Sequence, residues 1–243
     1  MIRRSLYAAL FLHCVWQSNA LADSVGVVVV AELTSVVESA IQNLDSTELE
    51  EDWLFTMEVV EEDEIRVIHS DPYRGKYERR QLISVNGVAP DEDRKEEFYE
   101  SEVERVDGLD PEALGYGYMV DGQTLQLLKA DDTYARFSFV PKVKALEGAG
   151  EQLRGSLLLN LNSGQIDEIE ITNSGQLTPA FSVTVDIYRL TLRFEQAQGE
   201  NLLTKLESHA SGKAGFLKSF ESLVEITFSD YTRAEPSPRS AEQ

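Results

Sequence analysis

The chain has 243 residues, with 22 Lys and Arg against 43 Asp and Glu, which gives a formal net charge of −21 at pH 7. This charge argues against a nucleic-acid-binding protein, because such proteins use Lys and Arg to replace the counterions of the phosphates. Hydrophobic residues make up 42% of the chain and charged residues 27%, which is typical of a folded protein rather than a disordered one.

The first 22 residues have the composition of a secretory signal peptide. Two arginines near the start are followed by an apolar run over 5–15, and the stretch ends in the small-x-small pattern Ala20-Leu21-Ala22. The apolar run is shorter than the about 20 residues that span a bilayer. We therefore predict cleavage near Ala22-Asp23 and a periplasmic protein whose mature chain has no transmembrane segment.

The first element of the mature chain is predicted to be an amphipathic helix. Apolar residues there recur at steps of three and four, which places them on one face of a helix. An acidic connection over 45–52 follows it. The residues of the apolar stripe are Val30, Leu33, Val37, Ile41 and Leu44.

From residue 53 onward, most of the chain alternates between apolar and polar residues, which predicts strands separated by tight turns such as Asn86-Gly87. Within 180–194 the alternation changes phase between Ile187 and Leu190, which predicts a β-bulge. The predicted strands cover 53–59, 65–69, 81–85, 117–120, 124–128, 133–140, 152–161, 165–172, 180–194, 202–210 and 216–231.

These elements predict a mainly β (α+β) fold in a single domain over 23–233. Consecutive strands joined by short turns form an antiparallel meander, and a sheet of about ten strands curls into an incomplete barrel. The N-terminal helix, with one or two further helices, is expected to cover the concave face. The charged segment 91–106 is predicted to be a helix or a helical loop on the surface, and 234–243 a flexible polar tail.

The residues argue against most kinds of catalytic site. The mature chain would lack cysteine, and its histidines, His69 and His209, are too far apart for a local metal motif. No complete P-loop, dinucleotide loop or Gly-x-Ser-x-Gly elbow is present. We therefore expect no enzyme activity, no metal and no cofactor. Because carboxylates are plentiful, a hydrolase that uses a carboxylate pair stays open as the weaker alternative.

One basic cluster stands out in this acidic chain, and it has two interpretations. The favoured interpretation is that its side chains form internal ion pairs with Asp71, Glu78 or the acidic helix. The alternative is a docking point for an anionic head group or for a partner protein of the envelope. The cluster consists of Arg74, Lys76, Arg79 and Arg80.

Aromatic residues on the predicted strands also have two interpretations. The favoured one is ordinary packing in the hydrophobic core. The alternative is a hydrophobic cavity in the curled sheet, open to the acyl chain of a lipid. The residues that would line such a cavity are Trp53, Phe55, Phe137, Phe139, Phe181 and Phe194.

The layout resembles the periplasmic lipoprotein-carrier superfamily, the LolA/LolB-like proteins and their uncharacterised relatives. A signal peptide, an amphipathic helix and a Trp/Phe strand lead into a meander that contains Leu153-Arg154-Gly155-Ser156-Leu157 and then Asn162-Ser163-Gly164-Gln165-Ile166. The resemblance implies an incomplete antiparallel barrel with a helical lid and an apolar cavity for acyl chains. It makes a lipid or lipid-modified protein the expected ligand, and a scaffold that binds envelope proteins without a ligand the alternative.

Overall fold

The computed structural model describes residues 32–47, 49–108, 115–143, 146, 152–215 and 218–235. The predicted signal peptide over 1–22 and most of the predicted tail, residues 236–243, lie outside the described residues.

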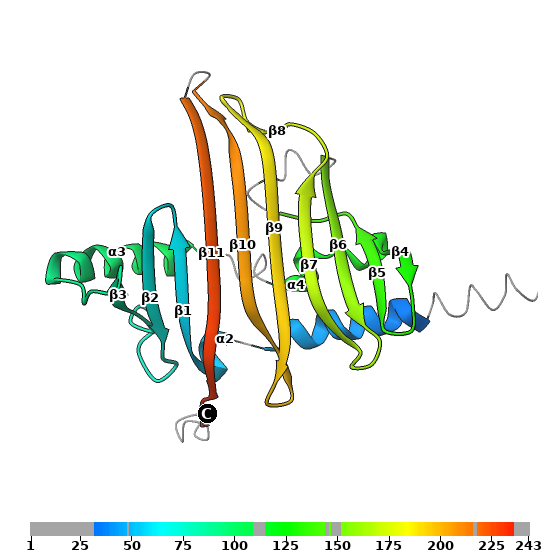
Figure 1. Ribbon diagram of the computed structural model, residues 1–243, viewed down its shortest axis with the longest axis horizontal. Helices are drawn as coiled ribbons and strands as arrows, with labels where there is room; N and C mark the ends of the chain where they lie inside the picture. Colours follow the sequence, from blue (N-terminus) through cyan, green and yellow to red (C-terminus); the bar gives the residue numbers. More distant parts are fainter. Residues whose placement is uncertain are drawn as a thin grey trace, which may run out of the picture.

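Eleven strands form one antiparallel sheet that does not close into a barrel, as Figure 1 shows. The order across the sheet is β3-β2-β1-β11-β10-β9-β7-β6-β5-β4, with β8 paired to β9. This confirms the predicted mainly β fold with an open antiparallel sheet. The strands are β1 Trp53–Glu61, β2 Glu64–Ser70, β3 Arg80–Val85, β4 Gln126–Ala130, β5 Tyr134–Phe139, β6 Leu153–Asn160, β7 Gln165–Asn173, β8 Leu177–Ala180, β9 Val183–Ala197, β10 Glu200–Ala214 and β11 Lys218–Arg233.

The helices pack against one face of the sheet, which we call the inner face. In Figure 1 the N-terminal helix (blue) crosses the half of the sheet that holds β4 to β7, and α3 crosses β2 and β3. The described helices are an N-terminal helix over 32–45, α2 (Leu49–Asp52), α3 (Glu92–Gly108) and α4 (Tyr116–Met119), with one 3-10 turn, η2 (Gly122–Thr124).

A first hydrophobic core lies between the N-terminal helix and the strands β5, β6, β7 and β9. Val37, Ile41 and Leu44 of the helix are at most 5% exposed, which confirms the predicted apolar stripe over the described part of the helix. Each such buried side chain stabilises the fold by roughly 1.5–3 kcal/mol. On the sheet the same core contains Phe137, Phe139, Leu153, Leu157, Leu159, Ile166, Ile169, Ile171, Leu192 and Phe194.

A second core lies at the other side of the sheet, around β1 and β2. Trp53, Phe55 and Met57 alternate along the inner face of β1 and are at most 2% exposed. Trp53 contacts Tyr231 of β11 edge-on, with 5.9 Å between the ring centroids, and Phe98 of α3 packs against the same cluster. The alternation predicted from Trp53 onward is confirmed.

Helix α3 is attached to the sheet by charges more than by apolar contacts. Its one buried side chain is Glu102, which is 6% exposed. Glu102 and Glu50 of α2 both pair with Arg105 of α3 and with Arg80 of β3, so that four side chains form a closed ring of ion pairs. Within the ring, Arg105 Nη2 lies 2.8 Å from Glu102 Oε2. The predicted charged helix is confirmed, and it is anchored through its acids.

Two predicted elements differ in the structure. The predicted strand over 117–120 is instead the short helix α4, whose Gly117 N–H donates to the carboxylate of Asp45 at 2.9 Å. A Cβ on Gly117 would lie 2.5 Å from that carboxylate, so the glycine permits this close approach. Phe181 does not lie on the inner face, since it precedes β9 and is 92% exposed.

Strand β9 contains a β-bulge within 180–194, as predicted, but it lies one residue before the expected phase change between Ile187 and Leu190. Ser211 pairs with Ile187 and Gly212 with Val185, so Asp186 is the extra residue on β9. The extra residue reverses the alternation, which keeps Val185 before the bulge and Leu192 after it on the buried side.

Candidate functional site

The middle of the inner face carries apolar side chains that are only half buried. Leu206 of β10 lies opposite Leu192 of β9 and Ile226 of β11. These three side chains, and those at every second position along β10 and β11, therefore point to the inner face. The half-buried side chains border both cores without being fully enclosed in either. We call these residues the central strip: Tyr188, Leu190, Leu206, Phe220, Val224, Ile226 and Phe228.

Small side chains on β10 keep the central strip partly open to solvent. Ser208 lies between Leu190 and Val224, and Ala210 lies between Tyr188 and Ser222. Short side chains at these positions leave Leu190, Tyr188 and Val224 without a large neighbour on β10. The strip therefore offers contact to a further apolar group, which is the property that a binding surface for apolar ligands needs.

Two partly buried tyrosines pack against the cores that border the strip. Tyr116 of α4 packs edge-on against Phe194 at 5.3 Å between ring centroids. Burial raises the pKa of Tyr116 to about 12, and the charge of Asp45 adds to the rise. Burial also raises the pKa of Tyr231, whose hydroxyl donates to the Leu203 carbonyl at 2.5 Å.

The raised pKa of Tyr116 predicts a loss of stability in strong base. The folded state keeps the phenol neutral, so its contribution is complete below about pH 10 and declines as pH rises towards 12, because the unfolded chain ionises first. We expect the free energy of unfolding, measured in urea at several pH values, to fall less steeply over this range for Tyr116→Phe than for the native chain. If the free energy of unfolding falls equally steeply with pH in both chains, the pKa of Tyr116 is not raised by folding.

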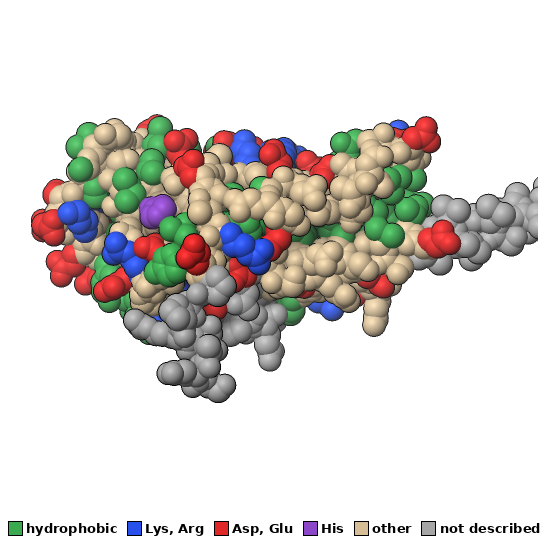
Figure 2. All heavy atoms as spheres, turned by 90° about the horizontal axis from the view of Figure 1, so that it is seen from below, with side chains coloured by type: hydrophobic (Ala, Val, Ile, Leu, Met, Phe, Trp, Pro, Cys, Tyr) green, Lys and Arg blue, Asp and Glu red, His purple; other side chains and the backbone are tan. Residues whose placement is uncertain are grey.

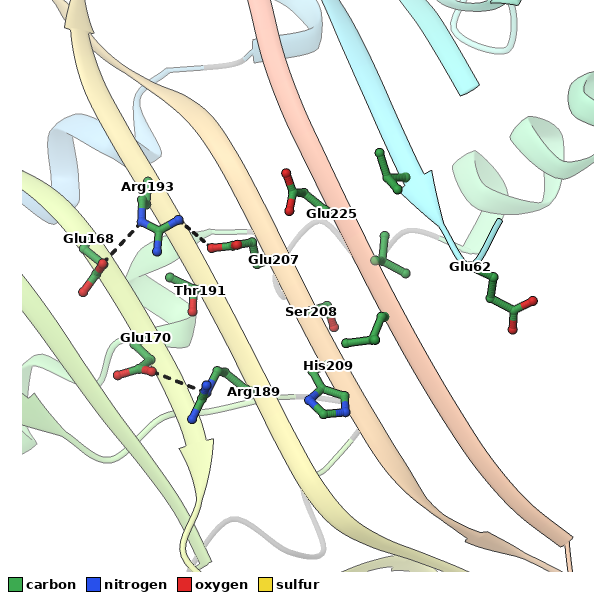
Figure 3. A pocket seen from close by; sticks show the side chains of 13 residues that line it. Glu62, Glu168, Glu170, Arg189, Thr191, Arg193, Glu207, Ser208, His209 and Glu225 are labelled. Atoms are coloured by element: carbon green, nitrogen blue, oxygen red, sulfur yellow. Dashed lines mark hydrogen bonds and ion pairs between the residues drawn. The ribbon is translucent and has the colours of Figure 1, made fainter. Parts of the chain in front are cut away.

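The opposite, outer face of the sheet carries a hollow of about 670 Å³ over β7, β9, β10, β11 and β1. Figure 3 shows its charged side chains in rows across neighbouring strands. Glu168 and Glu207 both contact Arg193, at 3.5 and 2.5 Å, and Glu170 contacts Arg189 at 3.6 Å. The hollow is therefore lined by ion pairs.

The two ion pairs of Arg193 belong to a ladder of alternating charge whose members come from five strands. Burial alone would raise the pKa of Glu207, but hydrogen bonds from Lys205 and Arg193 outweigh it and hold the pKa below its usual value. A carboxyl group that acts as a general acid needs the opposite, a raised pKa. Glu207 therefore lacks the raised pKa of a general acid. The ladder runs Arg136–Glu168–Arg193–Glu207–Lys205–Glu225.

His209 also lines the outer hollow, with its Nε2 3.3 Å from a carboxylate oxygen of Glu221. Sequence reasoning did not place any residue of this hollow, because alternating polar residues on the solvent side of strands form no motif. Within the described part of the chain, no group of three or more His, Cys, Asp or Glu is arranged to hold a metal ion.

The six aromatic residues proposed as a cavity lining are separated by the fold. Trp53 and Phe55 belong to the second core, and Phe137, Phe139 and Phe194 to the first. All five are at most 3% exposed, as the interpretation of ordinary core packing predicts, whereas Phe181 lies at the surface. The partly open apolar surface is formed by the central strip, whose residues the aromatic pattern did not single out.

Each of the four residues in the basic cluster has an acidic partner, as the internal-pairing interpretation predicts. Figure 2 shows basic and acidic side chains next to one another on the side of the molecule that it displays. The pairs are Arg74–Asp71 at 3.3 Å, Lys76–Asp107 at 3.7 Å, Arg79–Glu51 at 3.0 Å, and Arg80 with both Glu50 and Glu102.

Comparison with known proteins identifies no relative. No family model matches the chain, and no curated protein or solved structure is significantly similar to it. The membership of the lipoprotein-carrier superfamily therefore stays a prediction. Among the described helices, none combines the length and the apolar character that a bilayer span requires.

Proposed function

We propose that this protein is a non-enzymatic protein of the periplasm that binds the acyl chain of a lipid or of a lipid-modified protein on the central strip. The observation that supports the proposal is the row of half-buried apolar side chains on β9, β10 and β11, between two packed cores. Neighbouring apolar side chains that stay partly accessible on a folded chain are typical of an interaction site.

The shape of the strip suits a linear apolar ligand. Its longest row, Phe220 to Phe228 on β11, extends over roughly 26 Å at about 3.3 Å per residue. An acyl chain is linear and gains about 0.8 kcal/mol for each methylene that it buries. Several buried methylenes would therefore give a useful affinity without any polar anchor.

The charge of the chain limits how such a ligand is exchanged. A net charge of −21 is repelled by anionic membrane surfaces. A lipid would therefore be taken up from, and passed to, a protein partner of the envelope rather than a bare anionic bilayer.

A titration with a fluorescent fatty acid tests the proposal. The native chain is expected to bind the probe, and Leu206→Gln is expected to weaken binding at least tenfold by placing an amide in the strip. Leu223→Gln is the matched control, because Leu223 lies on the outer face of β11 and is 54% exposed. Failure of the native chain to bind, or equal binding by the two variants, would refute the acyl-chain site.

A further inference from the structure

Strand β3 leaves one edge of the sheet open. It is the last strand in the sheet order, and its one neighbour among the described strands is β2. The Asp71 N–H donates to the Arg79 carbonyl at 2.9 Å, so Asp71 and Arg79 form a hydrogen-bonded pair. Hydrogen-bonded and non-hydrogen-bonded pairs alternate along an antiparallel ladder. The backbone N–H and C=O groups of Arg80 and Leu82 therefore point away from β2, towards the open edge.

A hollow of about 370 Å³ lies along this edge, between β3 and α3. Gln81 and Leu82 both line it although they point to opposite faces of the sheet, so the hollow lies at the rim rather than on one face. From α3 it is lined by Phe98, which packs into the second core, and by Tyr99. A side chain entering the hollow would thus meet apolar surface continuous with that core.

The edge is only partly protected against pairing with another chain. Ile83 of β3 is 49% exposed and Tyr99 is 46% exposed. Edge strands are commonly protected by proline, by inward-pointing charges or by β-bulges. Strand β3 contains no proline or lysine, but its Arg80 points into the ion-pair ring and a bulge lies between Leu82 and Ser84. Figure 2 shows hydrophobic side chains exposed among charged ones at the left end of the molecule, where β3 and α3 lie in Figure 1.

The charge of the edge hollow is opposite to that of the chain. Arg74, Arg80 and Lys95 line it against a single acid, Glu78. Arg80 is committed to the ion-pair ring, but Arg74 and Lys95 are half exposed and pair only with neighbouring surface acids, at 3.3 and 2.7 Å. Exposed pairs of this kind contribute little, so an incoming carboxylate can replace the internal one.

We propose that β3 accepts an extended, acidic segment of a partner protein as an added strand. Backbone groups of the segment would bond to Arg80 and Leu82, an apolar side chain would fill the hollow beside Phe98, and carboxylates would contact Arg74 and Lys95. This is strand addition, in which backbone bonds give affinity and alternate side chains give specificity. The site is separate from the central strip and does not depend on a lipid.

Fluorescence anisotropy with a labelled synthetic peptide of ten alternating Val and Glu residues tests this proposal. The peptide is expected to bind the native chain. A peptide with the same residues but N-methylated at alternate positions, and a Val/Lys peptide, are each expected to bind at least tenfold more weakly. Hydrogen exchange should slow at the Arg80 and Leu82 amides when the Val/Glu peptide is added.

Charge-reversing variants identify the surface. The double variant Arg74→Glu/Lys95→Glu is expected to weaken binding of the Val/Glu peptide at least tenfold, whereas Lys129→Glu on the opposite edge strand, β4, should leave it unchanged. Circular dichroism checks that both fold. The proposal is overturned if the native chain does not bind, if methylation or charge reversal has no effect, or if this edge instead pairs with a second copy of the chain in solution.

Discussion

Replacing Glu102 by alanine is expected to lower the free energy of unfolding by about 3 kcal/mol, which is the cost of removing one partner from a buried ion pair. Glu102 accepts a hydrogen bond from Arg105 at 2.8 Å and lies 3.9 Å from Arg80. Without Glu102, the two arginines share one carboxylate, that of Glu50. In the native chain, burial alone would lower the pKa of Arg105, but the interactions with Glu102 and Glu50 outweigh it and raise that pKa. Urea unfolding followed by circular dichroism measures the change.

The matched control for Glu102→Ala is Glu100→Ala, on the exposed side of the same helix. Because both substitutions replace glutamate by alanine in α3, helix propensity changes equally. The control is expected to stay within about 0.5 kcal/mol of the native chain. If both variants lose the same stability, the ion-pair ring does not anchor α3.

Replacing Gly155 by valine is expected to cost about 3 kcal/mol, at the upper end of what overpacking of a core usually costs. Gly155 of β6 pairs with Phe139 of β5, and a Cβ on Gly155 would lie 2.3 Å from the ring of Phe139. The ring cannot move easily because it is 3% exposed. Thermal unfolding of the variant should therefore begin at a clearly lower temperature than that of the native chain.

The double variant Gly155→Val/Phe139→Leu tests the cause. A smaller side chain at 139 relieves the clash, so the double variant should be more stable than the sum of the two single effects predicts. Ser156→Val, at the next position but on the other face of β6, serves as the control and should be close to native. Additive effects in the double variant would contradict the steric explanation.

The sequence predicts the sheet well because one face of it is buried. Alternation marks residues such as Trp53 and Phe55, and a phase change marks the bulge at Asp186. Periodicity fails for α4, because Gly117 adopts a helical turn through a contact with Asp45, 72 residues earlier in the chain. The ion-pair ring around Glu102 could not be predicted from the sequence either, because its members come from three separate elements.

The site could be predicted only in part, for a related physical reason. A pattern of aromatic residues indicates which side chains face inward, but it does not distinguish an inner face that is fully packed from one that is partly open. Phe137 and Phe194 are packed by the N-terminal helix and its neighbours. Leu206 remains half buried because small residues neighbour it on β10, and that difference depends on the placement of helices over the sheet.

The most direct test of the acyl-chain site is native mass spectrometry of the full-length chain, purified from the periplasm under mild conditions without detergent. A bound species with the mass of one acyl lipid is expected in the native chain and in Leu223→Gln, and it is expected to be lost from Leu206→Gln. A native chain that carries no lipid, or a lipid that Leu206→Gln retains to the same extent, would contradict the acyl-chain site.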